Sequence, residues 1–350
     1  TGAPILANDP HLAIQMPSIW FQNGLHCTEV SSECPFEVAG FSFAGVPGVI
    51  IGHNANIAWG VTNLGPDVQD LYVEKVNPAN PNQYEVNGTW VDMEVHEETI
   101  NVAGGDPVTI EVRNTRHGPV ISGSYEALDE FDQSGVDTPQ PYAIALRWTA
   151  LDTNPGIVQT FIGLDTAANW EEFRTALASF TVPAQNFIYA DTSGNIGYQS
   201  PGTIPIRANG DGTLPVPGWT DDYEWAGFIP FEELPRSYNP ASGYIVTANN
   251  AVVDGTYPYS ITYDWNHGYR ARRIVDLVGS NSGIGLAEHG SIQFDSFSLN
   301  AQTVVPFLLE FDTPLRDVLA SWDLGNQVDS SAAAAFNAVW RRLLEYTFHD

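Results

Sequence analysis

The sequence predicts an α+β protein in which antiparallel strands come first and helices gather toward the end. Residues 49–51 and 57–62 are short, β-branched apolar runs joined by the turn Gly-His-Asn-Ala-Asn, which is typical of a hairpin. Two more hairpin signals follow, an Asn-Gly turn at residues 87–88 and a Gly-Gly-Asp-Pro loop at residues 104–107. Helical spacing begins after Asn169 and returns beyond residue 249.

Each helical segment has its own signal. Asn169 can cap free amides while Glu172 completes a capping box, and apolar residues then recur at helical spacing from 170 to 180. Phe336, Val339, Trp340, Leu343 and Thr347 mark one side of a terminal amphipathic helix. The intervening segment from 202 to 227 is rich in Pro, Gly and Trp, which favours a long ordered loop over a flexible linker.

Composition restricts the function classes. The 350 residues are enough for one large domain or two. With 42 acidic against 13 basic residues, the net charge of -29 argues against a nucleic acid partner, since phosphate neutralisation needs clustered Lys and Arg. No run of eighteen apolar residues occurs, so we expect no membrane span.

The two cysteines, Cys27 and Cys34, lie close together in the sequence. They make either a local disulfide, which implies an oxidising compartment, or two free thiols. A zinc site is not expected, because the neighbouring His26 and Glu29 do not have zinc-ligand spacing.

Residues 39–72 stand out as the centre of the chain, and four stretches that include part of them carry a family resemblance. They are Ala-Asn-Asp-Pro-His-Leu at 7–12, Gly-His-Asn at 52–54 with Ile-Ala-Trp-Gly-Val-Thr at 57–62, Gly-Tyr-Ile-Val-Thr-Ala-Asn-Asn at 243–250, and Tyr-Arg-Ala-Arg-Arg-Ile at 269–274. Together and in this order they resemble the penicillin amidase family of N-terminal-nucleophile hydrolases, which includes acyl-homoserine lactone and cephalosporin acylases. The likeness extends to about residue 295.

This resemblance implies a four-layer αββα sandwich with β-rich elaborations, truncated at both ends. The whole chain, 1–350, would be a β-subunit fragment. Its core sheet would use residues 1–75 and 140–260, its hairpin elaboration residues 76–125, and its helical part residues 266–350. An α-subunit segment of the same precursor would be its partner.

The implied chemistry is hydrolysis of a linear amide by an N-terminal Ser whose own α-amine acts as the base. In the family this Ser lies upstream of the segment that matches Thr1, so we expect this chain to lack it and to be inactive alone. Thr1 is an alternative nucleophile, but it precedes the first motif too closely for the family register.

By resemblance, Asn249 (side-chain amide) and the backbone N–H of Asn63 form an oxyanion hole, because acyl transfer needs donors aimed at the carbonyl oxygen. Arg270 would orient Asn249 and the nucleophile's amine, and His11 would position the seryl oxygen or a water. Simpler alternatives stay open: a turn residue for Asn249, an ordinary post-strand residue for Asn63, a structural ion pair for Arg270 and a hydrogen-bonded strand-end residue for His11. His53 belongs to a structural turn in the family, so we do not expect it to be a base.

Two further sites are expected. The acyl part of the substrate, a small-molecule acyl amide, would enter an apolar pocket lined by Trp20, Phe21, Phe41 and Phe43, although these aromatics could equally be core. A structural calcium ion is implied with oxygen ligands from Asp67, Gln69, Asp70, Pro205 and Asp264, the last of which departs from the family spacing. The alternative is that these carboxylates are simply solvated. We expect no organic cofactor.

A rival interpretation is a non-catalytic, calcium-stabilised, β-rich binding module of an extracellular protein. A glycoside hydrolase is a weaker rival, because no carboxylate pair can be singled out. Under either the amidase or the binding-module interpretation we expect a periplasmic or extracellular location.

Overall fold

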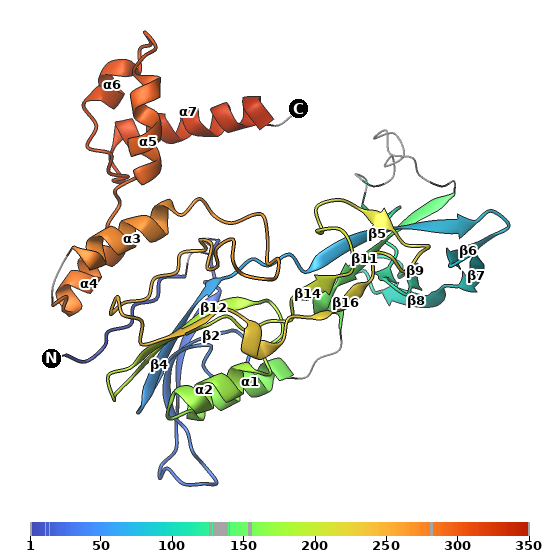
Figure 1. Ribbon diagram of the computed structural model, residues 1–350, viewed down its shortest axis with the longest axis horizontal. Helices are drawn as coiled ribbons and strands as arrows, with labels where there is room; N and C mark the ends of the chain where they lie inside the picture. The colour runs from blue at the N-terminus through green and yellow to red at the C-terminus, as the bar shows by residue number, and fades with distance from the viewer. Residues whose placement is uncertain are drawn as a thin grey trace.

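The structure is a computed structural model that describes residues 2–10, 12–13, 15–125, 128, 139, 141–152, 156–280 and 283–348. Its centre is a seven-stranded antiparallel sheet (Figure 1). In spatial order the strands are β1 (Trp20–His26), β2 (Glu37–Phe43), β3 (Ile51–Asn54), β4 (Ile57–Asn63), β12 (Gln185–Asp191), β13 (Ile196–Gln199) and β17 (Arg236–Tyr238). The predicted hairpin around residues 52–56 is confirmed as β3 and β4.

Helices α1 (Gly156–Thr166) and α2 (Trp170–Leu177) cover one face of this sheet (Figure 1). Their apolar sides meet those of the strands in the main core, where the side chains of Trp59, Leu164, Phe173 and Tyr189 are fully buried. The predicted cap is confirmed: the Asn169 side chain accepts a hydrogen bond from the Glu172 N–H, and the helix begins at Trp170. Capping of this kind satisfies an amide that the helix itself leaves free.

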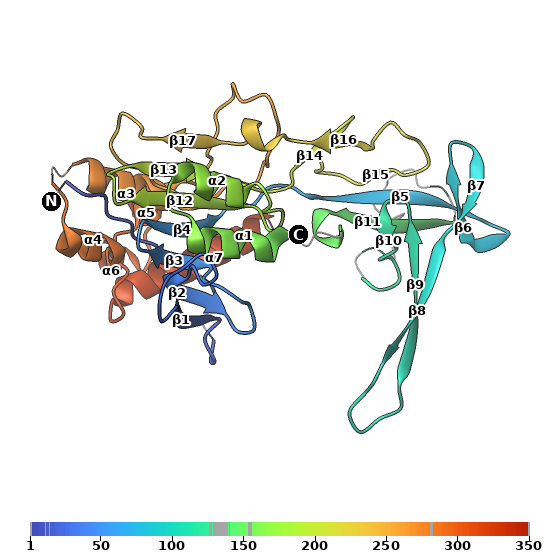
Figure 2. The ribbon, with the colours of Figure 1, turned by 90° about the horizontal axis from the view of Figure 1, so that it is seen from below.

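A second lobe extends from the end of β4 (Figure 2). Its long strand β5 (Gln69–Asn77) pairs with β11 (Tyr142–Trp148), β6 (Asn80–Val86) and, in parallel, β15 (Val216–Pro217), and β6 pairs with β7 (Thr89–Asp92). The hairpin of β8 (Glu94–Ile100) and β9 (Val108–Thr115) projects outward, with β10 (Gly118–Pro119) beside β9, and β14 (Pro205–Arg207) pairs with β16 (Trp225–Phe228). Both predicted hairpins of this region are confirmed.

The helical part lies over the other side of the sheet and beyond it (Figure 1). Helices α3 (Tyr269–Gly279) and α4 (Leu286–Gln293) come first, followed by α5 (Leu299–Leu308), α6 (Arg316–Ala320) and α7 (Ser331–Phe348). The last three share a core of their own around Phe336. The predicted terminal helix is confirmed as α7, although its Leu343 is exposed. Among the helices of the described residues, none is both long and apolar enough to cross a membrane.

The residue ranges predicted for the core sheet, the hairpin elaboration and the helical part stay a prediction. The sheets do not follow those ranges closely, because β5 and β11 pair with each other in the second lobe and not in the seven-stranded sheet. One connection between the lobes is the β4–β5 segment, which contains the predicted calcium ligand Asp67.

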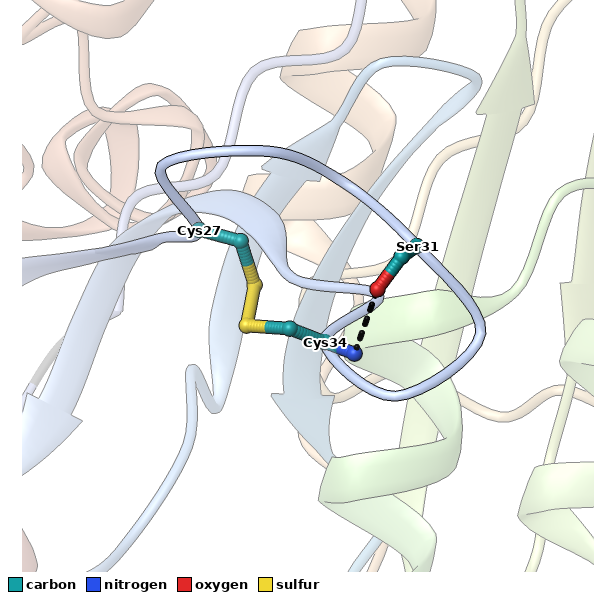
Figure 3. The surroundings of a disulfide bond; sticks show 3 residues. All are labelled: Cys27, Ser31 and Cys34. Carbon is teal, nitrogen blue, oxygen red and sulfur yellow. Dashed lines mark hydrogen bonds between the residues drawn. A yellow bond between two sulfur atoms is a disulfide. The ribbon is translucent and has the colours of Figure 1, made fainter.

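Cys27 and Cys34 form a disulfide in the loop between β1 and β2 (Figure 3). The backbone N–H of Cys34 also donates to the Ser31 hydroxyl across the same loop. Of the two possibilities that the sequence leaves open, the structure has the disulfide.

Candidate active site

The site is built on the edge of β4 that faces away from β12, the edge on which β3 pairs. The Leu64 N–H donates to the Ala184 carbonyl on the β12 side. Because backbone polar groups alternate sides along a strand, Asn63 and Val61 direct theirs to the opposite edge. On that edge β3 reaches only as far as the middle of β4, since its register pairs Gly52 with Trp59 and His53 with Ala58. The backbone groups of Val61 and Asn63 on this edge are therefore free to bind side chains instead of a neighbouring strand.

Asn8 serves Val61. Its side-chain amide donates to the Val61 carbonyl at 2.9 Å and its carbonyl oxygen accepts from the Val61 N–H at 3.1 Å. The sequence motif at 7–12 contained Asn8, but nothing in the sequence indicated that it would bind a strand fifty residues away.

Asn249 hydrogen-bonds to the backbone of Asn63. Its amide nitrogen donates to the Asn63 carbonyl at 2.8 Å, and its oxygen accepts from Nη2 of Arg270 at 2.7 Å. Asn249 has a left-handed backbone conformation with φ of 63°, which few residues other than Gly, Asn and Asp adopt readily. The bond to Asn63 uses one of the two donors of this amide, and Arg270 fixes which way it faces. Asn249 thus links Arg270 to Asn63, as the predicted grouping of these three residues requires.

Further hydrogen bonds hold the segment before Asn249 against β4. The Thr62 hydroxyl donates to that of Thr247 at 3.0 Å, and the Asn186 amide donates to the Thr62 hydroxyl at 3.1 Å and to the Asn63 carbonyl at 3.3 Å. Tyr198 in turn donates to Asn186 at 2.7 Å, and Asn186 is fully buried. Asn186 was missed in the sequence, where it is only the second residue of an apolar strand.

An open cavity of about 2020 Å³ adjoins these groups. Residues 3–10, Thr62, Asn63, Asn249 and Arg270 all contribute to its wall, together with helix α3. The two predicted oxyanion donors and the start of the chain therefore share one cavity.

The four predicted pocket aromatics separate into two pairs. The rings of Trp20 and Phe43 pack together with centroids 4.6 Å apart, and both line the cavity. Phe21 and Phe41 are 62% and 42% exposed and are not among its lining residues. Trp20 and Phe43 thus adjoin the cavity whereas Phe21 and Phe41 do not, and the role of all four as pocket residues stays a prediction.

Two of the predicted calcium ligands, Asp67 and Asp70, contact an arginine. Nε of Arg207 lies 2.8 Å from the nearer Asp70 oxygen, its Nη2 lies 3.3 Å from Asp67, and the Trp225 indole also donates to Asp70. Burial raises the pKa of Asp67, an effect that Arg207 opposes. Pro205 is buried, whereas Gln69 and Asp264 are exposed.

Among the described residues, no group of three or more acidic, histidine or cysteine side chains is arranged to hold a metal ion. A guanidinium between two carboxylates occupies the place that a cation would take, so this arrangement does not itself fit calcium. The calcium site therefore stays a prediction from resemblance.

His53 lies in strand β3, directly before Asn54, whose side chain holds the turn that follows. The Asn54 amide donates to the Asp165 and Ala167 carbonyls, and its oxygen accepts from the N–H groups of Asn56 and Ile57. This agrees with the structural role expected for the turn. Thr1 and His11 lie outside the described residues.

Asp165 is a buried carboxyl that the sequence did not single out. It is 1% exposed at the end of α1 and accepts hydrogen bonds from the Val49 N–H at 3.0 and 3.2 Å. Burial raises the pKa of Asp165 to about 7, although the Val49 N–H opposes the shift. Its carboxyl holds the end of the loop whose residues 45–47 line the cavity.

Comparison with known proteins agrees with the resemblance. The family model described as Penicillin amidase matches residues 1–350. Penicillin acylase 2 proenzyme of Pseudomonas sp. (strain SE83) is 30% identical over 98% of this chain and 43% of its own length. Acyl-homoserine lactone acylase QuiP of Pseudomonas aeruginosa is 31% identical over 90% of this chain and 36% of its own length.

Penicillin G acylase of Escherichia coli is 35% identical over 71% of this chain and 27% of its own length. The solved structure of a thermostable penicillin G acylase from Alcaligenes faecalis matches with a TM-score of 0.77 and 27% identity, covering 96% of this chain and 60% of that one. This likeness confirms the predicted fold class. The chain spans less than half the length of these curated relatives.

Proposed function

The chain belongs to the penicillin amidase family, and from this premise we propose that it is the part of an amidohydrolase that carries the oxyanion hole. The substrate would be the linear amide of an acylated amine, of the penicillin type or the N-acyl lactone type. Relatives bearing both kinds of name match this chain, so the proposal covers both.

The proposed reaction starts from a Ser upstream of this chain. Its α-amine takes the hydroxyl proton, and the oxygen attacks the amide carbonyl carbon. The carbonyl oxygen then becomes negatively charged and is stabilised by the second N–H of the Asn249 amide and by the Asn63 backbone N–H. Collapse of the intermediate breaks the C–N bond, and the amine leaves with the proton that the α-amine had taken. Water then attacks the acyl-Ser ester in the same way, with the α-amine again as the base, and the C–O bond to the Ser breaks to release the acid.

One observation carries this proposal: the chain of contacts from Arg270 through Asn249 to Asn63 at the wall of the cavity. Arg270 stays charged and donates from a rigid plane, so it can hold the Asn249 oxygen and leave the amide protons facing the strand edge. A merely structural turn would not need a left-handed Asn to be oriented by an arginine.

The proposal also covers the acyl pocket, the partner segment, the structural ion and the location. Trp20 and Phe43 would receive the acyl group, because both are apolar and line the cavity. An α-subunit segment of the same precursor would complete the enzyme, and calcium would be its structural ion. A periplasmic or extracellular location is supported by the Cys27–Cys34 disulfide, since disulfides persist in oxidising compartments.

The test uses the complete protein that we propose contains this chain. We expect Asn249→Ala to lower kcat for a phenylacetyl or long-chain acyl amide by at least about 100-fold, the usual loss for one oxyanion donor. Asn87→Ala is the matched control, because Asn87 also has a positive φ, of 49°, but lies in a turn of the second lobe. Comparable activity of Asn249→Ala and wild type would refute the proposal. The isolated 350-residue chain should release no amine.

A further inference from the structure

We propose that Asn8 is a positioning residue, which fixes the N-terminal segment in register with the oxyanion donors. The inference rests on the proposed function, because it concerns the segment that would lead from the nucleophile. No role in the reaction was expected for Asn8 from the sequence.

Asn8 satisfies both backbone groups of one residue. One side chain donates to the carbonyl and accepts from the N–H of the same residue, Val61, at 2.9 and 3.1 Å. A neighbouring antiparallel strand would bind Val61 with the same pair of hydrogen bonds, so the Asn8 side chain takes the place of a paired strand residue. A shift of the segment along the strand by one residue would break both bonds, because the next residue directs its polar groups to the other edge.

Strand β4 has a glycine, Gly60, where Asn8 packs against it. A Cβ atom on Gly60 would lie 2.8 Å from Cβ of Asn8 and 2.9 Å from its Cγ. Such a separation is shorter than carbon atoms tolerate, so any larger residue at position 60 would displace Asn8. The Asn8 side chain therefore packs directly over the backbone of β4.

Asn8 binds β4 close to the predicted oxyanion hole. Strands rise about 3.4 Å per residue, which puts Val61 about 7 Å from Asn63 along the same edge. Asn8 and Asn249 thus bind alternate residues of one strand, Val61 and Asn63. Residues 3–10 run along the cavity that both asparagines adjoin. Fixing Asn8 consequently fixes where the preceding residues lie relative to the predicted oxyanion hole.

Catalysis makes this precision necessary. A misplacement of about 1 Å between reacting groups can cost about 100-fold in rate. The nucleophile must approach a carbonyl carbon whose oxygen is held by Asn63 and Asn249, and Asn8 ties both partners to the same strand. Loss of the Asn8 contacts should therefore lower kcat more than it raises KM.

The experiment is Asn8→Asp in the complete protein, because this change keeps the shape of the side chain. At pH 8 the introduced carboxylate cannot donate to the Val61 carbonyl, and we expect kcat to fall at least about 10-fold with KM within about threefold of wild type. A protonated carboxyl donates and accepts as the amide does. The ratio of variant to wild-type kcat should therefore rise as the pH is lowered from about 8 toward 4, near the ordinary aspartate pKa of about 3.9.

Asn77→Asp is the matched control, because Asn77 also donates and accepts, to Gln83 and from Ala79, but lies in the second lobe. It should leave kcat and its pH profile unchanged. Gly60→Ala provides an independent variant that displaces Asn8 without changing it, and it should also lower kcat. Thermal unfolding of each variant identifies any that does not fold. If Asn8→Asp or Gly60→Ala does not fold, kcat of the other variant tests the inference.

Two results would overturn the inference: an Asn8→Asp enzyme with kcat within twofold of wild type at pH 8, or a loss that is independent of pH. Either result can occur while Asn249→Ala remains inactive, which leaves the proposed function standing. Absence of amide hydrolysis by the wild-type protein would instead refute the proposed function itself.

Discussion

Asp165→Asn tests whether a protonated carboxyl holds the loop at the cavity. Asparagine has nearly the same shape and still accepts a hydrogen bond from the Val49 N–H, but it has no charge to bury. Burial raises the pKa of Asp165 to about 7, from the ordinary value of about 3.9. The variant therefore removes the titration and keeps the contact.

The sign follows from proton linkage. A carboxyl whose pKa is higher in the folded state binds more protons there, so its stabilising effect is complete below pH 4 and is lost as the pH rises to about 7. Three pKa units correspond to about 4 kcal/mol, an upper value for the advantage of the variant at pH 8. Near pH 4 the two proteins should unfold at similar denaturant concentrations.

Urea unfolding at pH 4, 6 and 8 measures this difference in the free energy of unfolding. Asp295→Asn is the control of opposite sign, because hydrogen bonds from Arg273 lower the pKa of Asp295. That variant should lose stability relative to wild type as the pH rises from acid to neutral. If the difference between wild type and Asp165→Asn is the same at all three pH values, Asp165 does not titrate in this range and the reasoning fails.

Two further predictions concern the arginine cluster and the disulfide. If calcium binds at Asp67 and Asp70, Arg207→Gln should raise the affinity for the ion by about tenfold or more, because it removes a competing cation. An unchanged affinity in isothermal titration would place the ion elsewhere. Replacing Cys27 and Cys34 together by Ser should lower the free energy of unfolding by about 2 kcal/mol, as expected for a short loop, with reduced wild type as the control. A loss below about 0.5 kcal/mol would contradict a stabilising role for the disulfide.

Local features of the fold were predictable from the sequence. The Asn-Gly turn at 87–88 fixes its hairpin because both residues accept a positive φ, and both have it in the structure. The capping box at Asn169 located the start of α2 because the bonds involved span only three residues. In each of these cases the deciding interaction lies within a few residues along the chain.

The remaining features depend on contacts between distant segments. Arg207 lies 137 residues from Asp70, and no spacing rule connects an arginine in the Pro-rich segment 202–227 with a carboxylate at the start of β5. Neither helix α1 nor Asp165 within it was predicted from the sequence, and the burial of Asp165 depends on packing against the loop before Val49. Asn249, Asn63 and Arg270 were found only through resemblance to a family, because no residue pattern alone indicates which asparagine faces a cavity.

The shortness of β3 is what gives the edge of β4 its chemistry. A strand paired on both edges has no backbone group to offer a ligand, whereas β4 is paired on one edge only beyond Trp59. Asparagine suits such an edge because its amide donates and accepts at once, as the backbone does. Asn8 uses both functions on Val61, whereas Asn249 gives only its donor to Asn63 and leaves its oxygen to Arg270. Each amide keeps a second N–H, but only that of Asn249 has its plane fixed by a charged partner, because Arg270 holds the Asn249 oxygen.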